Sequence, residues 1–329
     1  MRAREYDESD VRVRPGRGTR PRTKRRPGHD DAEGAMVVAV DRGRWTCVPD
    51  ADPDRPPVTA MRARELGRTP IVVGDRVGLV GDLSGAPDTL ARIVRVDERS
   101  TSLRRTADDT DPFERLVVAN AEQLVIVTAV ADPTPRTGFV DRCLVAAYAG
   151  GLAPVLCLTK ADLADPEPFA AAYRELDIPV LVTRRDEEPA VLAKQVAGRL
   201  SALVGHSGVG KSTLVNRLVP DATQAIGRLS GIGKGRHTTV AALALPLAGG
   251  GWIVDTPGVR SFGLAHVSPD AVPAAFDDLA SAIEDCPRGC GHLGPPADPE
   301  CALDVLVADG RLRPSRLAAL RRVLVALQP

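Results

Sequence analysis

The stretch Gly205–Thr213, GHSGVGKST, decides the fold of this 329-residue chain. It follows the apolar run Ser201–Val204 and precedes a helix-like run, Leu214–Leu218. This strand–loop–helix context is what a phosphate-binding P-loop requires, because backbone N–H groups of the loop and the N-terminus of the helix together hold phosphate oxygens. Lys211 is expected to reach the β- and γ-phosphates, and Ser212 to ligate Mg²⁺. The predicted contacts in this loop are Gly205, His206, Ser207, Gly208, Val209, Gly210, Lys211, Ser212 and Thr213.

Two further motifs follow apolar runs. DTPG comes 44 residues after Lys211, where its Asp255 can hold Mg²⁺ and Gly258 can donate its N–H to a γ-phosphate. TKAD follows Ala153–Leu158, and such a motif reads guanine with its Asp while its Lys packs along the base. The predicted base-reading residues are Thr159, Lys160, Ala161 and Asp162. GTPases usually have Asn where Thr159 stands, but only five lysines occur in the chain, and two of them lie in these motifs.

The order of the motifs is unusual, because the base-reading motif precedes the P-loop. Apolar runs alternate with helix-like stretches such as Phe139–Tyr148 and Ala190–Leu200, which predicts a doubly wound parallel sheet. The ends of a compact domain often lie close together, so the same sheet can be built with its termini relocated. The sequence therefore predicts an α/β P-loop GTPase domain that is circularly permuted.

A glycine-rich segment, Gly231–Thr239, lies between the P-loop and DTPG and is expected to contain the first switch. Thr238 and Thr239 are both candidates to close onto Mg²⁺, and the sequence does not choose between them. Val259 follows DTPG and cannot orient a water molecule, so His237 is the candidate for that catalytic task. The alternative for His237 is a solvent-exposed loop histidine.

A cysteine–histidine cluster near the C-terminus has metal-ligand spacing. Three thiols and one imidazole suit a closed tetrahedral Zn²⁺ site, which is structural because no position is left for water. The predicted ligands of this one ion are Cys286, Cys290, His292 and Cys301; buried free thiols are the alternative. The other cysteines, Cys47, Cys143 and Cys157, are expected to be ordinary buried thiols.

The N-terminal third of the chain differs from the rest in its residue composition and in the length of its apolar runs. Residues 1–33 are rich in Arg, Asp, Gly and Pro, which predicts a disordered basic tail. Short β-like runs over residues 34–105 favour a small barrel such as an OB-fold, with a small β-sandwich as the alternative. We expect an OB-fold domain at 34–107, the GTPase domain at 114–265 and a small helical zinc-binding domain at 266–329.

Composition excludes few classes of protein. Basic and acidic residues balance at 43 each, so net charge gives no general attraction to nucleic acid. The basic tail and the five arginines after residue 310 are candidate polyanion contacts, or simply solvated surface. The sequence has no apolar run of about 18 residues, which argues against a membrane span. A soluble, cytoplasmic protein is expected.

With these motifs assembled, the chain resembles the ribosome small subunit-dependent GTPase A family, RsgA, also called YjeQ. The matching stretches are VANAEQ (118–123), VDRCLVAA (140–147), LTKADL (158–163), GHSGVGKST (205–213), GKGRHTT (233–239), DTPGVRSFGL (255–264) and the cysteine–histidine segment. The resemblance implies a monomeric enzyme that binds GTP and GDP, contacts the small (30S) ribosomal subunit and its 16S rRNA, and acts late in maturation of that subunit. It also implies faster hydrolysis on the subunit, with His237 catalytic. The two other functions considered are an ATPase and a binding module with a structural nucleotide.

Overall fold

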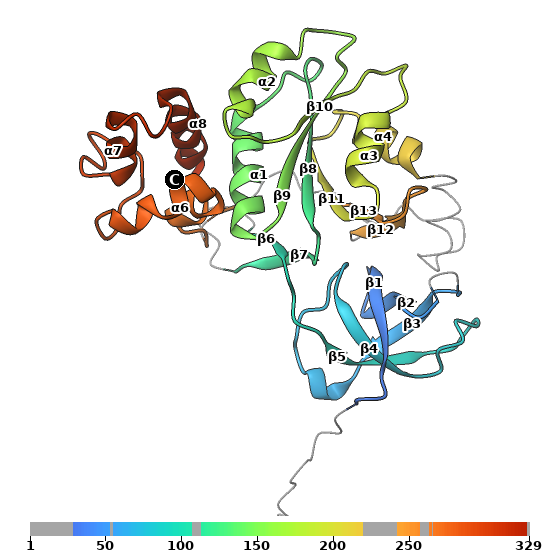
Figure 1. Ribbon diagram of the computed structural model, residues 1–329. Helices are drawn as coiled ribbons and strands as arrows, with labels where there is room; N and C mark the ends of the chain where they lie inside the picture. Colours follow the sequence, from blue (N-terminus) through green and yellow to red (C-terminus); the bar gives the residue numbers. More distant parts are fainter. Residues whose placement is uncertain are drawn as a thin grey trace, which may run out of the picture.

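The computed structural model describes residues 29–52, 55–106, 113–219, 242–256, 263–264 and 266–327. It comprises a β-barrel, an α/β unit above it and a helical unit beside the α/β unit (Figure 1). The predicted basic tail falls almost wholly outside these ranges. The domain boundaries given above remain predictions.

The N-terminal strands close into a five-stranded barrel. Around the barrel, β1 pairs with β2, β2 with β3, β3 in parallel with β5, β5 with β4, and β4 with β1. Ala35 and Val37 of β1 point into the barrel core, while Met36 and Val38 pack into the core of the neighbouring unit. Closure excludes the open sandwich and confirms the OB-like barrel. The strands are β1 (Glu33–Asp41), β2 (Arg44–Pro49), β3 (Val58–Arg62), β4 (Arg76–Gly81) and β5 (Ala91–Val96).

The hairpin of β6 (Ser102–Arg105) and β7 (Arg115–Ala119) links the barrel to the rest of the chain. The backbone N–H of Ala119 donates to the Val73 carbonyl of the barrel region at 3.0 Å, and that of Thr106 donates to Gly263 at 3.1 Å. Gly263 lies just after the DTPG segment. The hairpin is therefore hydrogen-bonded both to the barrel side and to the chain that leaves the predicted phosphate-sensing motif.

The α/β unit is built on a mostly parallel sheet in the order β10-β9-β8-β11-β13-β12, with only β12 antiparallel. This order confirms the predicted doubly wound arrangement. Strand β12 also pairs with β1 through Ala39 and Leu243, so barrel and α/β unit share one continuous sheet. The strands are β8 (Gln123–Ala129), β9 (Ala153–Thr159), β10 (Val180–Val182), β11 (Leu200–Val204), β12 (Leu243–Pro246) and β13 (Trp252–Asp255).

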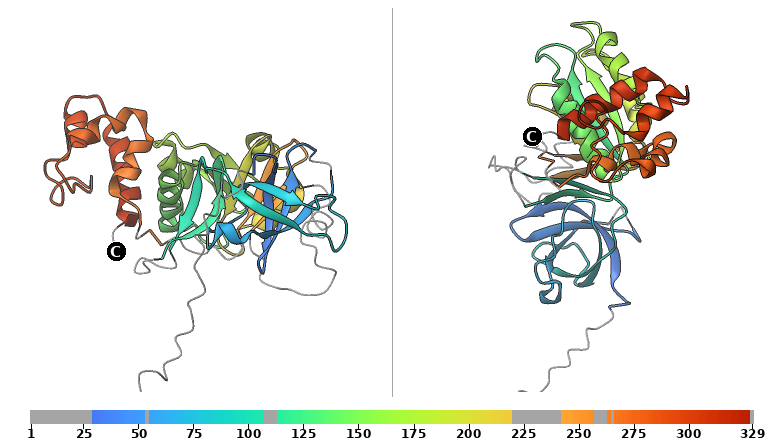
Figure 2. Two further views of the ribbon diagram at one scale, coloured as in Figure 1. Left: turned by 90° about the horizontal axis from the view of Figure 1, so that it is seen from below. Right: turned by 90° about the vertical axis from the view of Figure 1, so that its left-hand side faces the viewer.

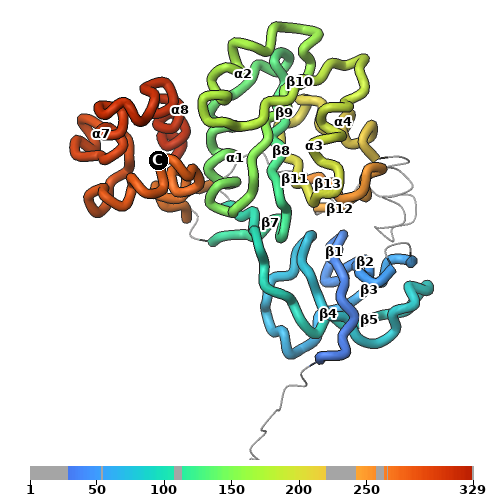
Figure 3. The backbone as a smooth tube through the Cα atoms, viewed as in Figure 1, coloured from blue at the N-terminus to red at the C-terminus, as the bar shows by residue number. Residues whose placement is uncertain are grey.

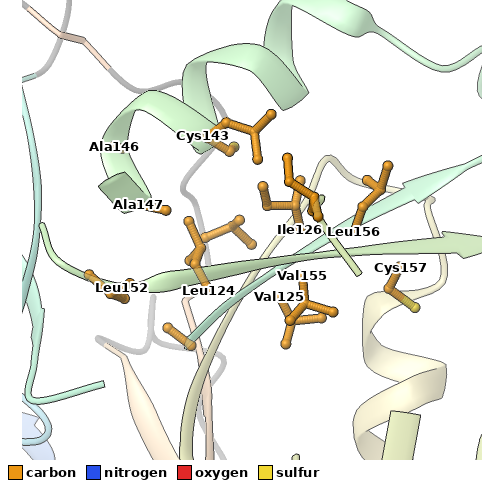
Figure 4. Close-up of a cluster of buried hydrophobic side chains, with 14 of the residues drawn as sticks. Leu124, Val125, Ile126, Cys143, Ala146, Ala147, Leu152, Val155, Leu156 and Cys157 are labelled. Carbon is orange, nitrogen blue, oxygen red and sulfur yellow. The ribbon is translucent and has the colours of Figure 1, made fainter. Parts of the chain in front are cut away.

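Helices cover both faces of this sheet, with α1 and α2 on one side and α3 and α4 on the other (Figure 1). In Figure 4, Leu124, Ile126 and Leu156 face Cys143 of α1, whereas Val125 and Val155 point to the opposite face. This explains why the central strands carry apolar residues toward both faces of the sheet. The helices are α1 (Thr137–Ala149), α2 (Glu167–Arg174), α3 (Ala190–Val196) and α4 (Lys211–Leu218).

One predicted helix is too long. The pattern over residues 190–200 predicts an uninterrupted helix, but α3 ends at Val196. Gly198 then adopts φ +70°, which turns the chain, and Leu200 already begins β11. By contrast, Cys47, Cys143 and Cys157 are buried free thiols as predicted. Burial raises the pKa of Cys47 and of Cys157 to about 12, so both stay protonated.

The C-terminal unit is helical and lies against α1, as the three views in Figures 2 and 3 agree. Its longest helix packs by an apolar face, since Leu317, Leu320, Val323 and Leu324 are buried. Its elements are η3 (Pro269–Ala271), η4 (Pro273–Ala275), α6 (Asp277–Ala280), η5 (Ala282–Asp285), α7 (Ala302–Ala308), α8 (Pro314–Leu324) and η6 (Val325–Leu327).

Three of the five C-terminal arginines, Arg316, Arg321 and Arg322, make contacts inside the protein, which corrects for them the prediction of a polyanion contact or solvated surface. Arg311 and Arg313 are exposed. Arg316 is only 8% exposed. It contacts both carboxylate oxygens of Asp278 at 2.9 and 3.0 Å, and its Nη1 donates to the backbone carbonyl of Glu175 in the α/β unit at 2.9 Å. Asp278 and Glu175 lie far from Arg316 in the sequence, so the local pattern of charges does not reveal these contacts.

Arg322 makes a second contact of this kind. Its guanidinium lies 4.6 Å from the Tyr173 ring centroid and 3.7 Å from the carboxylate of Asp141. Burial raises the pKa of the Asp141 carboxyl to about 6, against the opposing effect of the Arg322 charge. Together with Arg316, Arg322 joins α8 to the α1–α2 side of the α/β unit.

Within the described ranges, every helix is too short or too polar to cross a lipid bilayer.

Replacing Arg316 with Ala should loosen the contact between α8 and the α/β unit. The substitution removes hydrogen bonds to Asp278 and Glu175, and each is worth about 1 kcal/mol when one partner is charged and the other is partly solvated. Amide hydrogen exchange in α8 should therefore become about 30-fold faster, since a loss of about 1.4 kcal/mol corresponds to a factor of ten. Arg311→Ala, at an exposed site of the same segment, is the control. If the amide groups of α8 exchanged equally fast in Arg316→Ala and Arg311→Ala, the role of Arg316 in this contact would be contradicted.

Candidate functional site

A cavity of about 690 Å³ lies where the parallel strands end. Because the carboxyl ends of parallel strands meet at one edge of the sheet, the loops after β8, β9, β10, β11 and β13 all reach it. The predicted base-reading and phosphate-binding segments, far apart in the sequence, are thereby brought together. The lining residues include Asp132, Thr159, Lys160, Asp162, Thr183, Arg184, Arg185, Gly205, His206, Ser207, Gly208, Gly210, Lys211, Ser212, Thr213 and Asp255.

The P-loop connects β11 directly to α4. Gly210 precedes the helix with φ +92°, a left-handed conformation that residues with a Cβ rarely adopt. At Gly205 a Cβ would lie 2.6 Å from the carbonyl oxygen of Val127, so only glycine allows this close approach to β8. The loop thus has the backbone shape needed to direct N–H groups toward an anion at the N-terminus of α4.

Lys211 and Asp255 form an ion pair between the P-loop and the DTPG motif. Both side chains are largely shielded, at 14% and 30% exposure. Asp255 is held in place because β11 and β13 pair in register, with Leu203 opposite Asp255. Thr256 is buried, and its hydroxyl donates to the Leu203 carbonyl at 2.6 Å. The two phosphate motifs are therefore adjacent, as the sequence predicts.

A hydrogen bond from Thr159 joins the predicted base-reading loop to the P-loop. The Thr159 hydroxyl is buried and donates to the Val209 carbonyl at 2.6 Å. Lys160 contacts the backbone carbonyl of Asp132. One carboxylate oxygen of Asp162 accepts from the Arg185 backbone N–H at 3.1 Å, which orients this exposed acid. Although GTPases usually have Asn at this position, Thr159 therefore still links the two loops through a hydrogen bond.

Several cavity residues were missed by sequence reasoning. Thr183, Arg184 and Arg185 follow β10 and lie at the base-reading end of the cavity. The Thr183 carbonyl accepts from the Ala161 N–H at 3.2 Å, so this loop buttresses the base-reading motif. The only sequence signal for this cavity segment is that it follows an apolar strand, because it contains no recognised motif.

His206 lies within the P-loop and packs its ring against Phe139 of α1, with centroids 4.1 Å apart. Burial lowers the pKa of His206, and the positive charge of Arg136 adds to this effect. The imidazole is therefore neutral near pH 7 and adds no charge to the phosphate site. Four other predicted residues, His237, Thr238, Thr239 and Gly258, lie outside the described residues.

The predicted metal ligands converge in the C-terminal unit. One ligand atom from each of Cys286, Cys290, His292 and Cys301 lies within 4.8 Å of the others. The His292 Nδ1 atom is 3.5 Å from the Cys286 sulfur. Backbone N–H groups of His292 and Ala302 point at the sulfurs of Cys290 and Cys286, at 3.4 and 3.3 Å. Such N–H···S contacts stabilise thiolates, so the donor set fits one tetrahedral Zn²⁺ ion.

Thr159→Val should weaken nucleotide binding. Valine keeps the shape of threonine but leaves the buried Val209 carbonyl without its donor, at a cost of about 1–3 kcal/mol. We expect affinities for GDP and GTP to fall by roughly tenfold or more, measured by fluorescence titration with labelled nucleotides. Thr159→Ser keeps the hydroxyl and should bind nearly as the unaltered protein does. If valine bound as tightly as serine, the hydrogen bond would not organise the site.

Comparison with known proteins agrees with this geometry. The family model described as RsgA GTPase matches residues 96–265. A protein of Pseudomonas fluorescens strain SBW25, named small ribosomal subunit biogenesis GTPase RsgA, is 38% identical over 78% of this chain and 75% of the relative. A protein of the same name from Ectopseudomonas mendocina strain ymp is 41% identical, over 64% of this chain and 63% of that relative.

Solved structures share the fold. YloQ, described as a circularly permuted GTPase, aligns with a TM-score of 0.64 at 22% identity, covering 92% of this chain and 98% of YloQ. YjeQ from Thermotoga maritima aligns with a TM-score of 0.60 at 25% identity, covering 90% of this chain and 98% of YjeQ. These likenesses confirm the circular permutation predicted from motif order. The chain belongs to the RsgA GTPase family and is a GTP hydrolase.

Proposed function

We propose that this GTPase acts in biogenesis of the small ribosomal subunit, binding the 30S particle and its 16S rRNA late in maturation. GTP hydrolysis is faster on the subunit and controls release of the protein. The observation that carries the nucleotide part is the hydrogen bond from Thr159 to Val209, because it sets a guanine-type loop against the P-loop. The ribosomal part rests on the names of relatives that match three quarters of this chain.

In this proposal each loop of the cavity has one task. Asp162 accepts hydrogen bonds from the ring N–H and amine of guanine, and Lys160 packs along the base. Lys211 exchanges its partner Asp255 for the β- and γ-phosphates, while the backbone N–H groups of Gly205–Gly210 surround phosphate oxygens. Ser212, with Asp255 and Thr238 or Thr239, holds Mg²⁺. This ion neutralises charge that develops on the phosphates.

His237 orients the attacking water in this mechanism. In some other GTPases a glutamine follows the DxxG turn, but here that position is Val259, whose side chain has no hydrogen-bonding atom. The γ-phosphate is bonded by the Gly258 N–H. One structural Zn²⁺ ion is held by Cys286, Cys290, His292 and Cys301, a role supported by their mutual distances. The protein works as a cytoplasmic monomer.

An ATPase is the competing reading of the same P-loop, and the base-reading loop distinguishes the two. The Asp162 carboxylate can only accept hydrogen bonds when ionised, which suits the two donors on guanine. Adenine presents an acceptor at its ring nitrogen in that position and would be repelled.

Turnover should rise and saturate as purified small subunits are added, and GTP but not ATP should raise the melting temperature of the free protein. Phosphate release is measured against subunit concentration, with large subunits at equal concentration as the control. A rate that stays flat while GTP still binds would exclude the ribosomal role and leave the nucleotide site intact. Stabilisation by ATP alone would overturn the assignment of guanine.

His237→Ala should bind GTP normally but lose subunit-stimulated turnover by about 100-fold or more, as expected when a water-orienting group is removed. Nucleotide affinity and single-turnover rate on the subunit are measured in parallel. His29→Ala, which removes a histidine preceding the barrel, is the matched control and should react as the unaltered enzyme does. Normal turnover in His237→Ala would remove His237 from the mechanism.

A further inference from the structure

The metal centre has a carboxylate partner outside its ligand motif. Asp270 lies in η3, and its Oδ1 atom is 2.7 Å from Nε2 of His292. The other ring nitrogen, Nδ1, lies 3.5 Å from the Cys286 sulfur. We propose that Asp270 is a positioning residue of the metal centre, and that its carboxylate holds His292 in the tautomer that presents Nδ1 to the ion. This inference rests on the proposed zinc site.

The chemistry of the pair fixes where the proton lies. An ionised carboxylate can only accept, so Nε2 must carry the hydrogen and donate to Asp270. A neutral imidazole has one N–H group, which leaves a lone pair on Nδ1. The Asp270 side chain is 65% exposed. His292, in contrast, is fully buried and has no water with which to replace this acceptor.

The backbone of His292 is held by a different acid. His292 adopts φ +58°, a left-handed conformation that is uncommon for residues other than glycine. The carboxylate of Asp298 accepts from the N–H groups of Gly291 and Leu293, at 3.0 and 2.8 Å. Asp298 thus fixes the main chain on both sides of the ligand, while Asp270 fixes the ring. Asp298 and Asp270 therefore hold different parts of the same residue, the backbone and the ring of His292.

Asp270 also comes from a particular part of the chain. It follows the segment that leaves the nucleotide domain, where Gly263 is hydrogen-bonded to Thr106 and Leu264 is buried. The Ser268 hydroxyl accepts from the Asp270 N–H at 3.3 Å, which steadies the turn. One side-chain hydrogen bond therefore joins this exit segment to a metal ligand, so that the metal centre and the chain following DTPG hold each other in place.

The test measures zinc release from the full-length, zinc-loaded protein to a chromogenic chelator. Asp270→Ala should release zinc about 10- to 100-fold faster, the range seen when the partner of a ligating histidine is removed. The zinc-release rate of Asp270→Asn should lie between those of the unaltered protein and Asp270→Ala, because the Asn amide oxygen still accepts from Nε2. Asp309→Ala removes an equal charge at an exposed position of the same unit and should release zinc at the unaltered rate.

A second readout separates positioning from simple stabilisation. Nitrogen-15 NMR of the histidine side chains should show His292 with a protonated Nε2 and a metal-bound Nδ1, and the Nε2–H signal should exchange faster with water in Asp270→Asn. Release at the unaltered rate in both Asp270 variants, or equal acceleration by Asp309→Ala, would overturn the proposal. Should Asp270→Ala not fold, Asp270→Asn decides alone. An unaltered protein that carries no zinc would overturn the zinc site itself, which is a distinct failure.

Discussion

The parallel pairing of β8 with both β9 and β11 is the constraint on which the rest of the structure depends. It places the loops after three strands at one edge of the sheet, whatever the order in which the chain visits them. The base-reading loop can therefore precede the P-loop in sequence and still meet it in space. Hydrogen bonding between parallel strands fixes their direction and register but not their order in the chain. This is why permutation leaves the geometry of the site intact.

Much of this could be predicted from the sequence because the relevant signals are local. The P-loop needs glycine at Gly205 and Gly210 for steric reasons, and the four metal ligands lie within 16 residues. Side chains that act through distant partners gave no such signal. The motif predicts Thr159 as a base-reading residue, but it does not predict the hydrogen bond by which its hydroxyl joins two loops 50 residues apart. The loop after β10 also has no motif, and its place in the cavity follows from strand order alone.

The C-terminal arginines show the same limit. A cluster of basic residues suggests an exposed polycationic surface. Arg316 instead contacts Asp278 of its own unit and the Glu175 carbonyl of the α/β unit. Its long stem and five donors allow it to be buried while every hydrogen bond remains directed at an acceptor. Charge in a sequence therefore says little about exposure until the chain has folded and the partners are known.

The pairing of Ala39 with Leu243 has a consequence for how separable the parts of this protein are. Strand β12 would otherwise end the sheet as an open edge, with unpaired N–H and C=O groups that can recruit another chain. The barrel covers that edge, and at the other end β10 has only three residues. The barrel is thus a cap as well as a module. An excised GTPase domain would keep its cavity but expose an unpaired sheet edge. Its solubility would then depend on the barrel, although none of the described barrel residues lines the cavity.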